Sequence, residues 1–301
     1  MVIAGLEQRI LKVSIVTTIV VALIGVFFGL YAGSVSIVFD GMFDAVDASM
    51  SLLSLLVSKL LVAEVSRRFQ QGYWHMEPMV LALNGSVLIL LCIYAFINSI
   101  NSFLVGGTVL EFDSAIFYSL VIAATAFGMY FYERWVNRAV KSELINLDVQ
   151  SWLMSGAISC SLLVAFVIGY LLQESEYAWV TPYIDPLILT LLSLCLIPIP
   201  TMTVIKAFKQ ILMITPSALD HEISELMSQM AARYRFERFT HYVTQVGRGF
   251  FVEIHIVLPV EMNEWRVSDL DQLRDRISAE IGREGPDRWL SIGFTRDARW
   301  L

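Results

Sequence analysis

Three aspartates interrupt an otherwise apolar stretch of the sequence, residues 36–62, which reads SIVFDGMFDAVDASMSLLSLLVSKLLV. Asp40, Asp44 and Asp47 are spaced i, i+4 and i+7, so a helix would place all three on one face. A carboxylate at membrane depth is costly unless it faces a cavity, a partner or an ion. The spacing therefore predicts a cation site on a transport path, and a polar seam buried between helices is the alternative.

The composition indicates an integral membrane protein. Hydrophobic residues make up 56% of the 301-residue chain and charged residues only 16%, whereas soluble domains carry about 25% charged residues. The formal net charge of −7 argues against a nucleic-acid partner. The three cysteines have no spacing typical of a soft-metal site. No nucleophile–base constellation, phosphate loop or cofactor motif stands out, so the sequence indicates neither an enzyme nor a bound cofactor.

Six apolar runs are long enough to cross a membrane at about 20 residues per crossing. They lie near Val13–Tyr31, Ser36–Val62, Pro78–Leu104, Ala115–Trp135, Leu147–Leu172 and Pro182–Ile205. Lysine and arginine flank the runs on one side, whereas the opposite connections contain no lysine or arginine, and the charged residues that they carry are acidic. The positive-inside rule therefore predicts that both termini are cytoplasmic, and we expect a bacterial cytoplasmic (inner) membrane.

A different composition begins after Lys209 and predicts a small α+β domain. A helix starts near Ser217, two strand-like runs follow at Phe239–Val246 and Phe250–Val257, and a polar helix at Val267–Ile281 precedes a last strand. We therefore expect a six-helix transmembrane domain over residues 1–209 and a cytoplasmic α-β-β-α-β domain, ferredoxin-like, over residues 210–301.

Together these features resemble the cation diffusion facilitator family over nearly the whole chain. The resemblance is carried by six spans with both ends inside, an Asp-x-x-x-Asp on the second span and a C-terminal α-β-β-α-β domain. Asp40-x-x-x-Asp44 matches the metal pair of that family. Residues 72–78, which enter the third run, and residues 184–186, Ile-Asp-Pro, also resemble the corresponding family segments.

The resemblance implies a homodimer that exports divalent transition metals from the cytoplasm, usually in exchange for protons. It also implies a tetrahedral site completed by His/Asp-x-x-x-Asp on the fifth span. Here one alignment puts Leu147 and Ser151 at those positions, and another puts Asp148 and Trp152 there. Asp148 is the only acid in that run, so we expect it to be the third ligand beside Asp40 and Asp44. Whether Asp47, Asp148 or Ser151 completes the site stays open.

No histidine lies in any of the six runs, so the membrane site would offer only oxygen ligands. Such sites suit Mg²⁺, Mn²⁺ or Fe²⁺ better than Zn²⁺ or Cu⁺, although zinc also binds carboxylates. We expect the transported cation to be manganese, iron, zinc or a similar ion. Because carboxylates must lose their protons to bind metal, the same aspartates predict proton antiport by alternating access.

The sequence leaves three questions open, which concern the histidines, the coupling and whether the chain transports at all. His221, His241 and His255 either form a regulatory metal site, as in relatives, or are ordinary exposed histidines on a domain that makes dimer contacts. The chain is either a proton antiporter or a cation transporter with different coupling. The remaining alternative is a degenerate relative that works as a membrane-bound metal sensor or scaffold without transporting.

Overall fold

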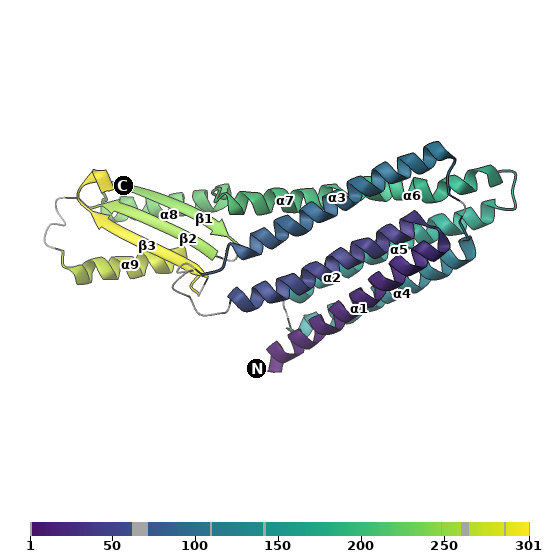
Figure 1. Ribbon diagram of the computed structural model, residues 1–301. Coiled ribbons are helices and arrows are strands. Elements are labelled where there is room, and N and C mark those ends of the chain that lie inside the picture. The colour runs from purple at the N-terminus through teal and green to yellow at the C-terminus, as the bar shows by residue number, and fades with distance from the viewer. Residues whose placement is uncertain are drawn as a thin grey trace. The chain divides into compact units, whose positions relative to one another are not determined.

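The computed structural model describes residues 2–61, 72–108, 110–140, 143–247, 249–259, 265–285 and 287–300. Long helices dominate the chain, and a small three-stranded sheet lies in its C-terminal part (Figure 1). The chain divides into two compact units, one formed by Met1–Leu56 and Leu83–Val204, and the other by Val57–Ala82 and Ile205–Leu301.

The helical part follows the predicted apolar runs. Its helices are α1 (Val2–Ala32), α2 (Val35–Leu61), α3 (Met76–Val105), α4 (Phe112–Val140), α5 (Glu143–Leu172), the short η1 (Ala178–Val180), α6 (Thr181–Leu196) and α7 (Pro198–Ile211). The sixth run is split between α6 and α7, because Pro198 has no N–H to donate across the break. Val62, the expected end of the second run, lies outside the described residues.

Five helical stretches in the described part of the chain are long and apolar enough to cross a membrane. They are Arg9–Ala32, Met76–Val105, Phe112–Ala139, Ser151–Leu172 and Ala178–Ile211. Helix α2, which carries the three aspartates, is not among them. Five of the six expected crossings are therefore supported by length and apolarity, and a crossing by α2 stays a prediction.

The core of the first unit is formed by side chains of α1 to α6, the helices of the bundle in Figure 1. Ile37, Tyr118, Leu162 and Phe166 belong to this buried core. Large apolar side chains also project outward from the helices, and Leu104 is 82% exposed. Water does not stabilise such a surface, whereas lipid does, and this agrees with an integral membrane protein.

Glycines bring α1 and α2 into backbone contact beside Asp40. A Cβ atom added to Gly41 would lie 2.5 Å from the backbone nitrogen of Val26. A Cβ atom added to Gly25 would lie 2.6 Å from the Cα of Gly41. Neither position has room for a side chain, so this small-residue contact sets how closely the two helices pack.

The C-terminal elements follow the predicted order α-β-β-α-β. They are α8 (Ser217–Tyr234), β1 (Arg238–Val246), β2 (Gly249–Val257), α9 (Val267–Ile281) and β3 (Arg288–Thr295), followed by the short η3 (Ala298–Trp300). In the sheet β2 lies between β1, with which it pairs antiparallel, and β3, with which it pairs parallel. The parallel pair requires a crossover, which α9 supplies.

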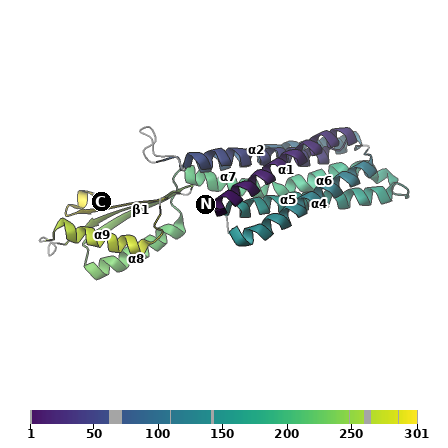
Figure 2. The ribbon, with the colours of Figure 1, turned by 90° about the horizontal axis from the view of Figure 1, so that it is seen from below.

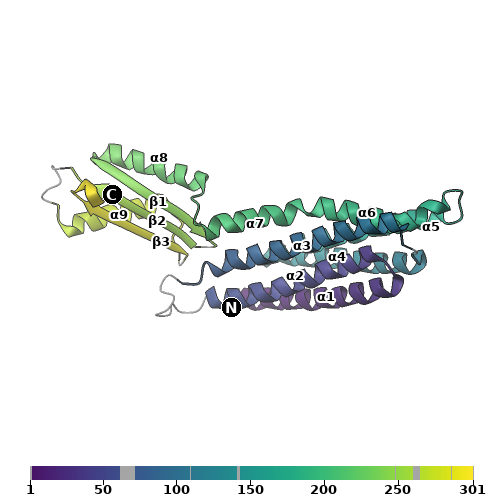
Figure 3. The ribbon, with the colours of Figure 1, turned by 45° about the horizontal axis from the view of Figure 1, so that its top comes forward.

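One face of this sheet is covered by α8 and α9, as Figure 2 shows from below. Val252, Ile254 and Ile256 of β2 point into the core on that side, whereas Glu253 between them is exposed. Buried and more exposed side chains therefore alternate along this part of the strand. Figure 3 shows the three strands from a different angle, with α8 along β1.

Candidate functional site

The Asp40 and Asp44 side chains are buried inside the helical unit, with exposed fractions of 1% and 4%. Tyr118 of α4 donates a hydrogen bond from its hydroxyl to Asp40 Oδ2 at 3.2 Å. Ser159 of α5 donates to the same oxygen at 3.4 Å, and Ser155 donates to Asp44 Oδ1 at 3.3 Å. The aspartates of α2 therefore meet polar groups from both α4 and α5.

The two carboxyl groups are only partly satisfied by these contacts. Asp40 Oδ1 and Asp44 Oδ2 are buried and have no hydrogen-bond partner. The three hydrogen bonds that do form are longer than the usual O–H···O distance of about 2.7–2.8 Å. Buried polar atoms are seldom left without a partner in folded proteins. Two free carboxylate oxygens beside two hydroxyl groups are an arrangement that can bind a cation.

The serines on α5 repeat the spacing of the aspartates on α2. Ser155 and Ser159 are four residues apart, as are Asp40 and Asp44, so each helix presents one oxygen-bearing side chain per turn to the other. Sequence reasoning missed both serines and Tyr118. The signal available in the sequence was the Ser-x-x-x-Ser spacing itself, located two helical turns beyond the positions that the family alignments indicated.

Asp148 belongs to a different group of side chains. In the described part of the chain, the hydrogen bonds to Asp40 and Asp44 come from Tyr118, Ser155 and Ser159, and none comes from Asp148 or Ser151. The charge of Asp148 instead acts on Asp47 and on Glu133 of α4. Leu147, the other alignment candidate, lies in α5, but its side chain is outside the described ones.

No metal-binding cluster is preformed among the residues that the structure describes, because no three His, Cys, Asp or Glu side chains converge. In the C-terminal part each histidine has one carboxylate neighbour. His241 Nε2 lies 2.9 Å from Asp220, His255 Nε2 lies 3.1 Å from Glu253, and His221 Nδ1 lies 3.8 Å from Glu225. A regulatory metal site in this domain therefore stays a prediction.

Asp185, in the Ile-Asp-Pro segment, holds the beginning of α2. Its Oδ1 accepts a hydrogen bond from the Ser34 hydroxyl at 2.6 Å, and its Oδ2 accepts one from the Val35 N–H at 3.0 Å. Ser34 Oγ in turn accepts from the Ile37 N–H at 3.1 Å, which is an N-cap contact. This buried aspartate therefore orients the helix that carries Asp40 and Asp44.

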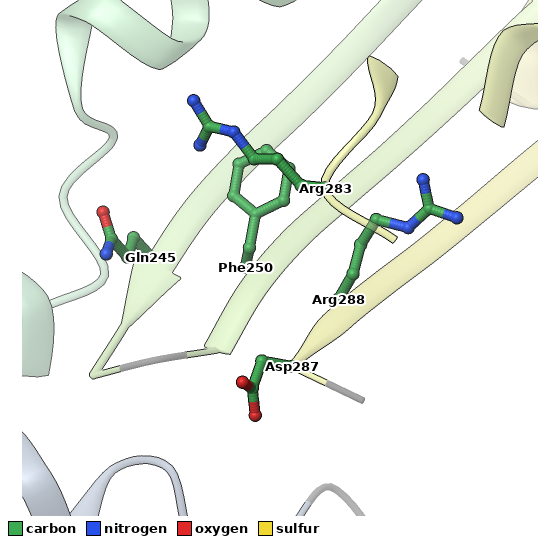
Figure 4. A pocket seen from close by; sticks show the side chains of 5 residues that line it. All are labelled: Gln245, Phe250, Arg283, Asp287 and Arg288. Atoms are coloured by element: carbon green, nitrogen blue, oxygen red, sulfur yellow. The ribbon is translucent and has the colours of Figure 1, made fainter. Parts of the chain in front are cut away.

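A pocket in the C-terminal unit does not provide a second candidate site. It has a volume of about 180 Å³ and is lined by Gln245, Phe250, Arg283, Asp287 and Arg288 (Figure 4). Arg283 pairs with Glu222 at 3.1 Å and lies over the Phe250 ring. Arg288 donates to the carbonyl oxygens of Ser278 and Gly282. Both guanidinium groups are therefore engaged within the domain, so neither is left to bind an anionic ligand.

Comparison with known proteins identifies the family. The profile described as the cation efflux transmembrane domain matches residues 11–213, well over half of the chain. A search of curated proteins gave no match. Proteins of the matched family are transporters of metal cations and not enzymes. The chain therefore belongs to the cation efflux family, the cation diffusion facilitators, and is a membrane-bound metal cation transporter.

Proposed function

We propose that this transporter exports a divalent metal cation and that Asp40 and Asp44 hold the cation during transport, with Ser155 and Ser159 as further oxygen ligands. The observation that carries the proposal is the pair of buried aspartates, each with one oxygen that lacks a partner. Two ionised carboxylates carry two negative charges, which balance the charge of one divalent cation. Tyr118 would position Asp40 for binding through its hydrogen bond.

The donor set favours a hard or borderline cation. Carboxylate and hydroxyl oxygens suit Mg²⁺, Mn²⁺ and Fe²⁺ better than the softer ions that prefer thiolates or imidazoles. The four side chains supply no nitrogen or sulfur ligand. We therefore expect Mn²⁺ or Fe²⁺ to be transported better than Zn²⁺ or Cd²⁺.

Proton antiport is the coupling that these residues support. Each carboxylate must be deprotonated to bind the metal, so metal binding releases protons and metal release takes them up. If the site opens alternately to the two sides of the membrane, a cation moves one way and protons the other.

The membrane arrangement forms part of the same proposal. Helix α2 makes a sixth crossing with its aspartates facing α4 and α5, which removes their charges from lipid. Both termini lie in the cytoplasm of a bacterial cell, the transmembrane domain ends near residue 209, and two chains associate as a homodimer through residues 210–301.

The test is metal transport by the purified protein in proteoliposomes that contain a pH-sensitive dye. We expect Mn²⁺ transport with counterflow of protons in the wild type, and a loss of at least about 100-fold in Asp40→Asn and Asp44→Asn, since each removes one charged ligand. Asp113→Asn, an exposed acid in the first turn of α4, is the matched control and should transport normally.

Other results would point to the remaining functions. Transport without proton counterflow would indicate a different coupling mechanism. Failure of the wild type to move Mn²⁺, Fe²⁺, Co²⁺, Zn²⁺ or Cd²⁺ would contradict the proposal and favour a sensor or scaffold.

A further inference from the structure

Glu133 of α4 is a buried acid that the Asp40 and Asp44 pair does not use. Its side chain is 0% exposed, and both of its carboxylate oxygens lack a hydrogen-bond partner. The neighbouring Arg134 does not neutralise it, because that side chain is exposed and hydrogen-bonds to Tyr130. Glu133 is therefore a fully buried carboxyl group whose oxygens have no partner at hydrogen-bond geometry, although Ser14, Trp152 and Asp148 lie near enough to act on it.

Acidic and polar side chains of α1 and α5 lie near Glu133, and an acid of α2 interacts with one of them. Asp148 of α5 interacts with it electrostatically, and Asp148 Oδ2 is itself buried without a partner. Ser14 of α1 and Trp152 of α5 adjoin the pair, and Trp152 Nε1 donates to Ser14 Oγ at 2.7 Å. Asp47 of α2 interacts electrostatically with Asp148. None of the ion pairs that the structure describes supplies a lysine or arginine to these acids.

Such a group is stabilised by a cation, or by protons when no cation is bound. Buried carboxylates without a countercharge repel one another and lose their hydration, which is costly in a membrane. Small hard cations such as Mg²⁺ are commonly held by one or two carboxylates while they keep several of their waters. This mode of binding requires no closed cage of three protein ligands, and none is preformed among the described side chains.

We propose that Glu133, Asp148 and Asp47 form a second cation station, which binds one partly hydrated divalent cation and passes it to the Asp40 and Asp44 pair. The inference rests on the proposed function, because a station has a role only if the chain transports a cation.

The position of this station relative to the aspartate pair supports a relay. Asp47 lies one helical turn beyond Asp44, and their charges interact. Asp148 lies seven residues before Ser155 in α5, which corresponds to about 10 Å along the helix axis. The acids therefore form an unbroken series from Glu133 to Asp40, with each charge acting on the next.

An apolar layer borders the station on the side of the helix ends. Ile10 of α1 and Ile145 of α5 are buried there, and Val136 of α4 packs against them. These residues lie three or four positions from Ser14, Asp148 and Glu133, respectively, which is about one helical turn. If the termini are cytoplasmic, the station would be the first polar site that a cation meets after it enters from the cytoplasm and crosses this layer.

The first experiment counts bound Mn²⁺ on the purified full-length protein by electron paramagnetic resonance. We expect Glu133→Gln to bind one ion fewer than the wild type. The double variant Asp40→Asn/Asp44→Asn should keep the ion that Glu133→Gln loses, and the triple variant should lose both. Glu133→Asp retains the charge and should restore binding, which separates loss of the ligand from misfolding. Glu111→Gln, an exposed acid, is the control. An unchanged count in Glu133→Gln would overturn the station.

The second experiment measures transport in proteoliposomes with the same variants. We expect Glu133→Gln to raise the KM for Mn²⁺ by about tenfold and to change kcat less, because loading is impaired while the aspartate pair is intact. Loss of proton counterflow with an unchanged Mn²⁺ count would show that Glu133 carries a proton and not a cation, which also overturns the station. If the wild type transports no metal, the proposed function itself fails. This result differs from both a raised KM in Glu133→Gln and a loss of proton counterflow in that variant.

Discussion

At the scale of single residues, the unusual feature of this site is the use of serines opposite the aspartates. A hydroxyl oxygen is a weaker cation ligand than a carboxylate, but it adds no charge. Ser155 and Ser159 donate long hydrogen bonds to the aspartates, so they can turn their lone pairs towards a cation at little cost. With both carboxylates ionised, the proposed site would carry two formal charges, and its donor atoms would all be oxygen.

Replacing Ser159 by alanine tests this role. Ser159 is 0% exposed, and Ser159→Ala removes one oxygen with little change in volume. We expect the KM for Mn²⁺ to rise by about tenfold, because a ligand is lost while both carboxylates remain. Initial rates of uptake into proteoliposomes measure the effect.

Ser161→Ala is the matched control for that substitution. Ser161 lies on the same helix, and its hydroxyl donates to the carbonyl of Ala157 one turn earlier. It should leave the KM unchanged. An equal rise in KM for both variants would mean that α5 is perturbed in general and that Ser159 is not a ligand.

At the scale of elements, α2 is positioned by contacts at two points along its length. Gly41 packs backbone to backbone against Gly25 of α1, and Asp185 of α6 holds the N-terminal turn through Ser34 and Val35. The negative carboxylate also lies at the positive end of the α2 dipole. These contacts hold the helix so that Asp40 and Asp44 face α4 and α5.

The capping contact predicts a loss of stability in Asp185→Asn. An amide keeps one acceptor but places an NH₂ group against one of the two donors, which leaves a buried donor unpaired. We expect the free energy of unfolding to fall by about 1–3 kcal/mol, measured by thermal unfolding in detergent. Asp113→Asn, on the exposed side of α4, should change stability little. Loss of transport with unchanged stability would instead assign Asp185 to the transport chemistry.

At the scale of the whole molecule, the family match covers residues 11–213, and the chain continues beyond it into a small α+β domain. In the described part of that domain, each of its histidines has a carboxylate neighbour. The distribution of basic residues along the sequence predicts that this domain is cytoplasmic. The predicted orientation of the entire chain therefore depends on the lysine and arginine residues of several connections, each of which favours the same side of the membrane.

Thiol labelling of intact cells checks the orientation. A cysteine in place of Glu176, between α5 and η1, should react with a membrane-impermeant reagent added outside. A cysteine in place of Ser228, exposed on α8, should react only after permeabilisation. The wild type, whose Cys92, Cys160 and Cys195 are all unpaired, gives the background. The reverse pattern of labelling would contradict cytoplasmic termini.

Local patterns predicted much of the fold because they depend on residues that are close in sequence. Two successive strand-like runs were predicted at Phe239–Val246 and Phe250–Val257, and the structure confirms them as the antiparallel pair β1 and β2. The helix Val267–Ile281 was predicted with the observed bounds. The predicted bounds of α1 and α4 were too narrow. Both helices continue beyond their apolar runs into more polar residues, and hydropathy alone does not mark where such a helix ends.

By itself the sequence determined that the chain is a membrane protein and predicted a cation site at Asp40 and Asp44, because hydropathy and i, i+4 spacing are properties of one helix. Only the tertiary structure decided which side chains meet them. Ser155, Ser159 and Tyr118 approach the pair, and Asp148 lies beside Glu133 instead. The rotation and axial shift of one helix against another are set by packing between distant segments, such as the contact of Gly25 with Gly41. No spacing within a single helix encodes them.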